Sequence, residues 1–360
     1  MTQAKMNRAL IVKLGAIGDV LMAIPAAYAL HQQGVEIDWV CGQGVAPLLA
    51  CYPWIRTIVA DERALLRGTK SAQAKALASL WMVLGGQHYL VCATLYYDAR
   101  YRWITFPVRA SRKVSLSMTS RAESLLPGRH HTDEYARIIL GLEDGERPLA
   151  LSPVRPVGLP ASPLVRVVGR SRVVLAPAGA KNMMRDDALR RWPAERYVEL
   201  ARTLLARGLD VVLVGGPEDG WVVPFFEGAG VTDLIGRLSL VETVALLDES
   251  DVLVTHDTGP LHMGGVTRAG IVAVFGPTDP RGRIPQRENV VAIWGGEGFA
   301  CRPCYDGKDF APCLSNGCMQ QVTVEMVLEQ VEAVLEQRRS GSRPPRVVTP
   351  QSTVGVEDWR

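Results

Sequence analysis

The sequence predicts an α/β protein made of two Rossmann-like halves, each an open parallel sheet covered by helices. Three observations predict this class: short apolar runs alternate with helical patterns through the first half, a proline-rich segment interrupts them, and the alternation then resumes. The length of 360 residues favours two domains, and contents of 48% hydrophobic and 21% charged residues are typical of a globular protein.

The first half, residues 1–150, alternates strands and helices. Its apolar runs predict strands at 9–13, 37–41, 55–59 and 89–94, and its periodic segments predict helices at 20–33, 71–84 and 132–142. In the first of these helices, Ile24, Ala27 and Tyr28 recur at helical spacing. Strands that alternate with helices in this way are typical of a parallel sheet.

A proline-rich stretch separates the halves, and we expect an interdomain linker at 151–170. The second half, 171–339, predicts strands at 172–176, 210–214, 252–255 and 270–276, and helices at 194–207, 240–248 and 323–339. Residues 340–360 are rich in Pro, Arg, Ser and Thr, and we expect a disordered tail. Two such halves describe a GT-B-like arrangement, in which ligands bind in a cleft lined by strand carboxyl ends.

The charge pattern limits the partners. A net charge of +3 is too small to indicate nucleic acid. Basic residues are nevertheless concentrated between Arg100 and Arg129, where Glu123 is the one acid. This stretch is either a solvated face or a patch that holds an anionic acceptor or a membrane surface. No run has transmembrane length and no signal peptide is recognised, so we expect a cytoplasmic protein, with peripheral inner-membrane contact left open.

The turn after the first predicted strand carries Lys13, Gly15, Gly18 and Asp19. The glycines allow a tight turn, which puts Asp19 in the first turn of the following helix. Asp19 either caps that helix or acts as a general base, because a helix N-terminus favours an ionised carboxylate. The spacing does not supply the G-x-G-x-x-G fingerprint of a dinucleotide site.

A second turn, His256-Asp257-Thr258-Gly259-Pro260-Leu261-His262, joins the strand at 252–255 to a helix. Backbone N–H groups, a hydroxyl and a helix N-terminus there predict a site for a phosphate or diphosphate. Elsewhere in this half, Arg190 or Arg191 is either a phosphate clamp or part of a solvated helix entrance, and Glu195 is a candidate acceptor for ribose hydroxyls. Trp192 is predicted to be a core anchor, and Gly215 marks either a ligand contact or a structural turn.

The motifs Lys13-x4-Gly18-Asp19, Arg190-Arg191-Trp192-Pro193, Gly215-Gly216-Pro217 and Asp257-Thr258-Gly259-Pro260-Leu261-His262 stand in one order along the chain. That order resembles glycosyltransferase family 9, the ADP-heptose:lipopolysaccharide heptosyltransferases. The resemblance implies that Asp19 is the catalytic base. It implies a donor site formed by Lys13, Ala178, Arg190, Glu195, Gly215, Asp257, Thr258, Gly259, Leu261 and His262. Arg190 stands where many members have lysine, and arginine also binds phosphate.

The implied activity is an inverting transfer of heptose from ADP-heptose to a hydroxyl of a lipopolysaccharide-core sugar or of a protein. The first half would bind the acceptor and the second half the nucleotide sugar. Transfer would need no cofactor. Two alternatives stay open: a nucleotide-sugar epimerase, or a non-catalytic nucleotide-sugar-binding protein of the same fold.

Four cysteines gather in the loop 301–318, namely Cys301, Cys304, Cys313 and Cys318. Four thiols at this spacing are candidate ligands for a structural iron or zinc ion, although the spacing is not that of a zinc ribbon. Some family members that this stretch resembles contain iron and modify proteins. The alternative is four reduced thiols that pack a loop.

Overall fold

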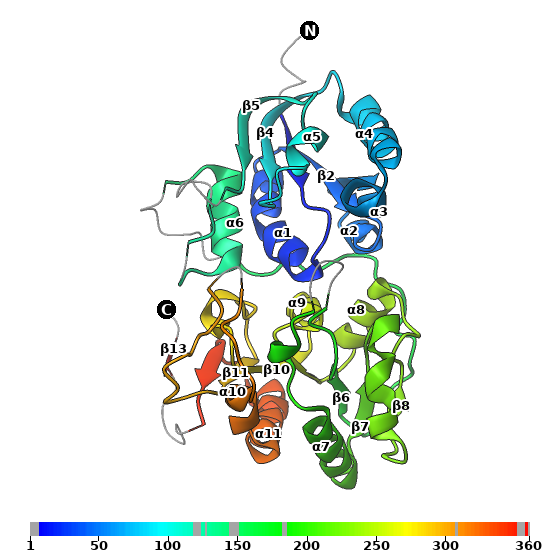
Figure 1. Cartoon of the computed structure of the whole chain (residues 1–360). Coiled ribbons are helices and arrows are strands. Elements are labelled where there is room, and N and C mark those ends of the chain that lie inside the picture. The colour runs from blue at the N-terminus through cyan, green and yellow to red at the C-terminus, as the bar shows by residue number, and fades with distance from the viewer. Residues whose placement is uncertain are drawn as a thin grey trace. The chain divides into compact units, whose positions relative to one another are not determined.

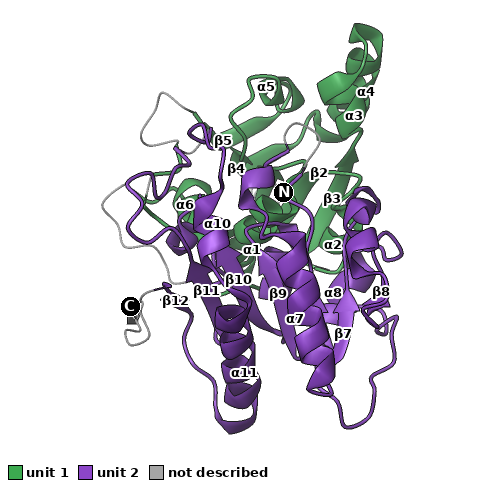
Figure 2. Ribbon diagram, turned by 60° about the horizontal axis from the view of Figure 1, so that its bottom comes forward, with its two compact units in different colours: residues 1–158 green, residues 159–360 purple. Residues whose placement is uncertain are grey.

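The computed structural model describes residues 7–117, 124–126, 128–143, 151–181, 186–306, 309–350 and 357–358. The chain divides into unit 1, Met1–Gly158, and unit 2, Leu159–Arg360 (Figure 2). This division falls inside the segment 151–170 that the sequence predicted as a linker. Residues 144–150, where the expected first half ends, lie outside the described residues.

Unit 1 is a five-stranded parallel sheet with the strand order β3-β2-β1-β4-β5 (Figure 1). Its strands are β1 (Arg8–Val12), β2 (Glu36–Gly42), β3 (Ile55–Ala60), β4 (His88–Thr94) and β5 (Arg109–Ser115). Its helices are α1 (Ile17–Gln32), α2 (Ala46–Leu49), α3 (Glu62–Arg67), α4 (Lys70–Leu84), α5 (Tyr101–Ile104) and α6 (His131–Leu140). The chain order reverses between β1 and β4, the kind of point beside which ligands bind in open parallel sheets.

Strand β5 was not expected from the sequence. Its residues, Arg109 to Ser115, fall in the basic stretch that was interpreted as a solvated face or an anion-binding patch. An edge strand has one neighbour, so alternate side chains can face solvent and carry charge. The apolar pattern that reveals an interior strand is therefore missing here.

Unit 2 is an eight-stranded sheet with the order β13-β12-β11-β10-β9-β6-β7-β8, parallel except for β13. Its strands are β6 (Arg172–Leu175), β7 (Asp210–Leu213), β8 (Thr232–Asp233), β9 (Val252–His256), β10 (Gly270–Phe275), β11 (Val290–Trp294), β12 (Arg346–Val348) and β13 (Glu357–Asp358). Its α-helices are α7 (Ala194–Ala206), α8 (Leu240–Asp248), α9 (Gly259–Gly265), α10 (Gly317–Gln321) and α11 (Val324–Ser340), and its 3₁₀ segments are η2 (Ala188–Arg190), η3 (Pro217–Phe226) and η4 (Pro280–Gly282). The chain order reverses between β6 and β9, so the turns after these strands lie at a ligand-binding position.

The expectation of a disordered tail over 340–360 is wrong for part of its length. Arg346–Val348 form β12, which pairs in parallel with β11. Arg346 is buried, and its guanidinium bonds the side-chain oxygens of Gln330 and Gln337 on α11. Composition favours disorder, but these contacts with β11 and α11 order this segment.

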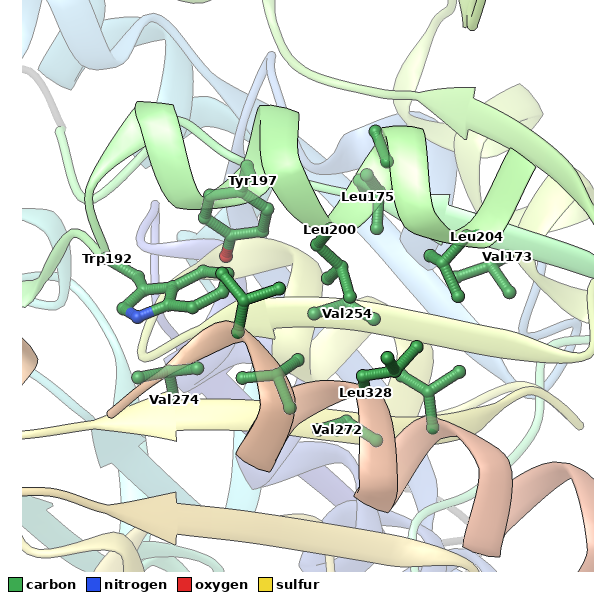
Figure 3. Close-up of a cluster of buried hydrophobic side chains, with 14 of the residues drawn as sticks. Val173, Leu175, Trp192, Tyr197, Leu200, Leu204, Val254, Val272, Val274 and Leu328 are labelled. Atoms are coloured by element: carbon green, nitrogen blue, oxygen red, sulfur yellow. The ribbon is translucent and has the colours of Figure 1, made fainter. Parts of the chain in front are cut away.

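The core of unit 2 lies between α7, α11 and the central strands (Figure 3). Trp192, Tyr197 and Leu200 pack there against Val254 and Leu328. The prediction that Trp192 is a core anchor is confirmed: it is 1% exposed. No helix in the described parts of the chain combines the length and the apolar character needed to cross a bilayer.

Candidate functional site

In unit 1 the segment after β1 brings a lysine into contact with an aspartate. Lys13 is buried, and its Nζ lies 2.7 Å from Oδ2 of Asp19. The N-cap position of α1 is Ala16, so Asp19 is a first-turn residue and not the cap. The side chain of Asp19 is 27% exposed and that of Lys13 is 3% exposed. A carboxylate beside a cation and a helix N-terminus is favoured in its ionised form, which a general base requires.

Glu62, the first residue of α3, lies beside the same segment and was missed from the sequence. Burial raises the pKa of Glu62, and the charge of Lys13 lowers it. A Cβ on Gly15 would lie 2.8 Å from Oε1 of Glu62, and a Cβ on Gly42 would overlap Oε2. A side chain at Gly15 would therefore displace the Glu62 carboxyl, and one at Gly42 would also meet the backbone oxygen of Leu14. No sequence spacing connects these residues, since the fold alone brings α3 to this turn.

The backbone of this turn is also strained. Ala16 has a φ of 56°, in the left-handed region, which costs a residue with a side chain about 1–2 kcal/mol. Strained backbone persists where surrounding contacts hold it, and such positions concentrate at functional sites. The strain immediately precedes the helical turn that carries Asp19.

In unit 2 the turn after β9 places Asp257 between two arginines. Oδ2 of Asp257 accepts a hydrogen bond from Oγ1 of Thr278 at 2.8 Å, and Nη1 of Arg190 lies 3.4 Å from the same oxygen. Nε of Arg283 lies 3.8 Å from it. Burial raises the pKa of Asp257, but the charges of Arg283, Arg190 and His262 outweigh burial and hold that pKa below its usual range.

Arg283 and Thr278 were missed from the sequence. Both follow β10, the neighbour of β9, so the rule that carboxyl ends of adjacent parallel strands meet could have found them. Arg190 also bonds Oδ2 of Asp187 at 2.9 Å. Within the described part of the chain, Nε of Arg190 is buried and has no hydrogen-bond partner. A buried unpaired donor is costly, which favours a ligand atom as its partner.

The turn after β6 is bonded to the turns after both neighbouring strands. Oγ1 of Thr258 accepts from N of Ala180 at 2.8 Å. The carboxylate of Asp219 accepts from N of Gly179 at 3.0 Å and from N of Gly216 at 2.7 Å. A Cβ on Gly179, which has a φ of 88°, would lie 2.7 Å from Oγ1 of Thr258. These bonds hold three turns in one arrangement at the carboxyl edge of the sheet.

Other predicted donor-site residues have structural surroundings. Leu261 is fully buried in a core cluster, and its N–H already donates to a backbone carbonyl. A Cβ on Gly215 would lie 3.0 Å from the Asp219 side chain, which favours a structural turn at this glycine. Ala178 is buried in the core, whereas Glu195 is exposed on the first turn of α7.

His256, the last residue of β9, is fully buried. Its Nδ1 lies 3.1 Å from the hydroxyl oxygen of Tyr197. Burial, followed by the charges of Arg190 and Arg191, lowers the pKa of His256 to about 3. The imidazole is therefore neutral near pH 7 and supports the turn without carrying charge.

The four cysteines of the loop 301–318 are reduced. Burial raises the pKa of Cys304, and the charges of Cys301 and Cys313 raise it further, so these thiols are neighbours. Burial raises the pKa of Cys318 to about 11. However, the described residues contain no group of three or more His, Cys, Asp or Glu side chains arranged to hold a metal ion. The four thiols therefore do not fit the predicted iron or zinc site in this conformation.

The sequence and the fold match known proteins. The model of glycosyltransferase family 9 (heptosyltransferase) matches residues 150–314. Lipopolysaccharide heptosyltransferase 1 of Pseudomonas aeruginosa is 27% identical over 335 residues, which cover 88% of this chain and 89% of that protein. The structure of E. coli ADP-heptose lps heptosyltransferase II matches with a TM-score of 0.69 and 19% identity, covering 92% of this chain and 99% of that one. E. coli heptosyltransferase WaaC with ADP matches with a TM-score of 0.68 and 19% identity, covering 91% and 99%.

Each unit is a Rossmann-like α/β unit, and the likeness to these two structures shows the GT-B fold class that the sequence predicted. The chain is similar to glycosyltransferase family 9, the heptosyltransferase family, over residues 150–314, and to one heptosyltransferase along most of its length.

Proposed function

We propose that this enzyme transfers heptose from ADP-heptose to a sugar hydroxyl of the lipopolysaccharide core, with inversion at the anomeric carbon. The observation that carries the proposal is the pair of arginines at Asp257, one of which has a buried unpaired donor. The names of the relatives support the substrate classes. One relative is a lipopolysaccharide heptosyltransferase, and E. coli WaaC was solved with ADP and with ADP-2-deoxy-2-fluoro heptose.

In this proposal unit 2 binds the donor. The guanidinium groups of Arg190 and Arg283 bind diphosphate oxygens, because arginine pairs with phosphate through two parallel N–H bonds. Thr258, Gly259 and His262 border the same position at the start of α9. When the bond from the anomeric carbon to the phosphate oxygen breaks, negative charge grows on the diphosphate. Fixed positive groups stabilise that charge more in the transition state than in the bound substrate.

Unit 1 supplies the base. Asp19 accepts the proton of the acceptor hydroxyl as its oxygen attacks the anomeric carbon from the face opposite the diphosphate. The new carbon–oxygen bond forms as the bond to phosphate breaks, and the electron pair leaves with ADP. Lys13, which the sequence assigned to the donor, instead has the role of orienting Asp19 through their 2.7 Å contact. The arginines stabilise the negative charge of the departing ADP, so the proposed step uses no cofactor.

Mass spectrometry of the products tests this function against its alternatives. The enzyme is incubated with ADP-heptose and with either a heptose-deficient core oligosaccharide or a hydroxyl-bearing protein. We expect the oligosaccharide to gain the mass of one heptose while ADP is released. An altered heptose without acceptor would instead indicate an epimerase. Binding of ADP-heptose with no turnover would indicate a non-catalytic protein. Transfer of heptose to the hydroxyl-bearing protein but not to the oligosaccharide would show that the acceptor is a protein.

A further inference from the structure

Helices α4 and α5 of unit 1, both labelled in Figure 1, contact each other. An aromatic cluster lies where they meet. The ring centroids of Trp81 and Phe106 are 5.8 Å apart, and those of Trp103 and Phe106 are 5.9 Å apart. Phe106 is 65% exposed and Trp103 is 46% exposed. Met82, next to Trp81 on α4, is 80% exposed. Large apolar side chains gathered on a surface mark an interaction site more often than single exposed ones do.

The cluster is fixed in place by a hydrogen bond. Nε1 of Trp81 donates to the carbonyl oxygen of Trp103 at 2.7 Å, which joins the end of α4 to α5. The bond fixes the indole of Trp81 and the backbone of Trp103, so the segment that carries the exposed ring of Trp103 is held against α4. A backbone that is already held loses little conformational freedom when the ring it carries is buried in a lipid layer.

The surroundings of the cluster are basic. From Arg63 to Ala122 the sequence contains ten lysines and arginines and one acid, Asp98, and that acid is bonded to Arg100. The guanidinium of Arg102 lies 5.7 Å from the ring centroid of Trp103. Two further exposed cations, Arg109 and Lys113, lie on the edge strand β5, where Nζ of Lys113 also donates to the carbonyl oxygen of Thr105. Charges on an edge strand prevent strand pairing, but that role does not account for the neighbouring exposed aromatic rings.

We propose that this aromatic–basic face, formed by Trp81, Met82, Arg102, Trp103, Phe106, Arg109 and Lys113, docks unit 1 on an anionic lipid surface. Tryptophan and phenylalanine settle at the depth of the headgroups, where an apolar ring meets the acyl chains. Lysine and arginine beside them bind the headgroup phosphates, and each adds to the attraction of an anionic leaflet. The pairing of exposed rings with a stretch of chain that has ten basic residues and one acid favours lipid over a protein partner. This docking does not rest on the transfer reaction.

Vesicle co-sedimentation tests the proposal with the full-length protein. Vesicles containing phosphatidylglycerol are compared with vesicles of phosphatidylcholine alone, at low and high salt. We expect binding to the anionic vesicles that weakens as salt screens the charges, and little binding to phosphatidylcholine. Replacing both rings, Trp103→Ser with Phe106→Ser, should weaken binding by about tenfold or more, because two apolar side chains lose their burial.

Two controls keep the test decisive. Phe225→Ser removes an aromatic residue of unit 2 that is 41% exposed, and it should leave vesicle binding unchanged. Arg102→Glu with Arg109→Glu keeps the rings and should weaken binding to anionic vesicles alone, with circular dichroism confirming that each variant is folded. Equal sedimentation of wild type and the ring variant would overturn the proposal. Self-association that depends on Trp103 and Phe106, without vesicle binding, would overturn it in favour of a second copy of the chain.

Discussion

The guanidinium of Arg283 lies 5.5 Å from the ring centroid of Tyr305, and its Nε lies 3.8 Å from Oδ2 of Asp257. Tyr305 belongs to the cysteine-rich loop, and its N–H and that of Cys304 lie 3.2 Å and 3.0 Å from the carbonyl oxygen of Pro277. The loop is thus bonded to the segment that supplies Thr278 to Asp257. We interpreted this loop from the sequence by its thiols. In the structure it supports the proposed anion site through its contacts with Arg283 and Pro277.

Tyr305→Ala should weaken ADP binding by about 2- to 5-fold, because a cation–π contact near the surface contributes about 0.5–1 kcal/mol. Tyr305→Phe keeps the ring and should bind ADP like the wild type. Isothermal titration calorimetry measures both. Equal affinity of Tyr305→Ala and Tyr305→Phe would show that the ring does not position Arg283 for the nucleotide.

Asp19→Asn should lower the turnover rate by roughly 10²-fold or more, the usual scale for the loss of a general base. ADP affinity should change little, since donor binding is assigned to unit 2. Asp98→Asn, which removes another unit 1 carboxylate paired with an arginine, is the matched control and should keep near wild-type turnover. A fully active Asp19→Asn enzyme would remove Asp19 from the mechanism.

Acid should destabilise the fold partly through His256. Its folded-state pKa is lowered from 6.5 to about 3, mainly by burial, so between these values the unfolded chain binds a proton that the folded chain does not. The free energy of unfolding should therefore fall as pH drops from about 6.5 toward 4. Urea unfolding across this range should show a shallower pH dependence in His256→Gln than in the wild type. The same pH dependence of the free energy of unfolding in both proteins would contradict this contribution of His256.

Gly42→Ala should destabilise unit 1 by about 1–3 kcal/mol, because the new Cβ would overlap the Glu62 carboxyl and lie 2.8 Å from the backbone oxygen of Leu14. Gly44→Ala is the matched control, since no atom lies within 4 Å of a Cβ there, and its effect should stay within about 0.5 kcal/mol. Thermal and urea unfolding compare the two variants. Similar stability in both would mean that Glu62 moves away freely.

Thiol reactivity should separate the cysteines of the loop 301–318. Cys301 and Cys313 are exposed and should react first with a thiol reagent, while burial raises the pKa of Cys304 and Cys318 and should slow both. Cys301→Ser with Cys313→Ser should remove the fast phase. Elemental analysis of protein purified without chelator accompanies the titration. One equivalent of zinc or iron, with all four thiols protected until a chelator is added, would restore the metal interpretation.

Much of the fold could be predicted from local patterns in the sequence. Eight predicted strands correspond to β1, β2, β3, β4, β6, β7, β9 and β10, because each is a short apolar run between turn residues. Strands β5, β8, β11, β12 and β13 were not predicted, and of these β5 and β12 escaped prediction for opposite reasons. β5 is a polar strand at a sheet edge with three charged residues, Arg109, Arg112 and Lys113, and β12 lies in a segment whose composition favours disorder.

The sequence by itself determined the class of the fold and the two turns that carry Asp19 and Asp257, and it indicated the resemblance to glycosyltransferase family 9. These depend on periodicity and on motifs whose residues are neighbours in the chain. The tertiary structure alone decided that Lys13 holds Asp19, that Glu62 fills the space over Gly15 and Gly42, and that Arg283 joins Arg190 at Asp257. It also left the four cysteines, close in sequence, without a common ligand geometry. Contacts between distant segments depend on strand order and turn conformation, and neither is encoded in the spacing of any single motif.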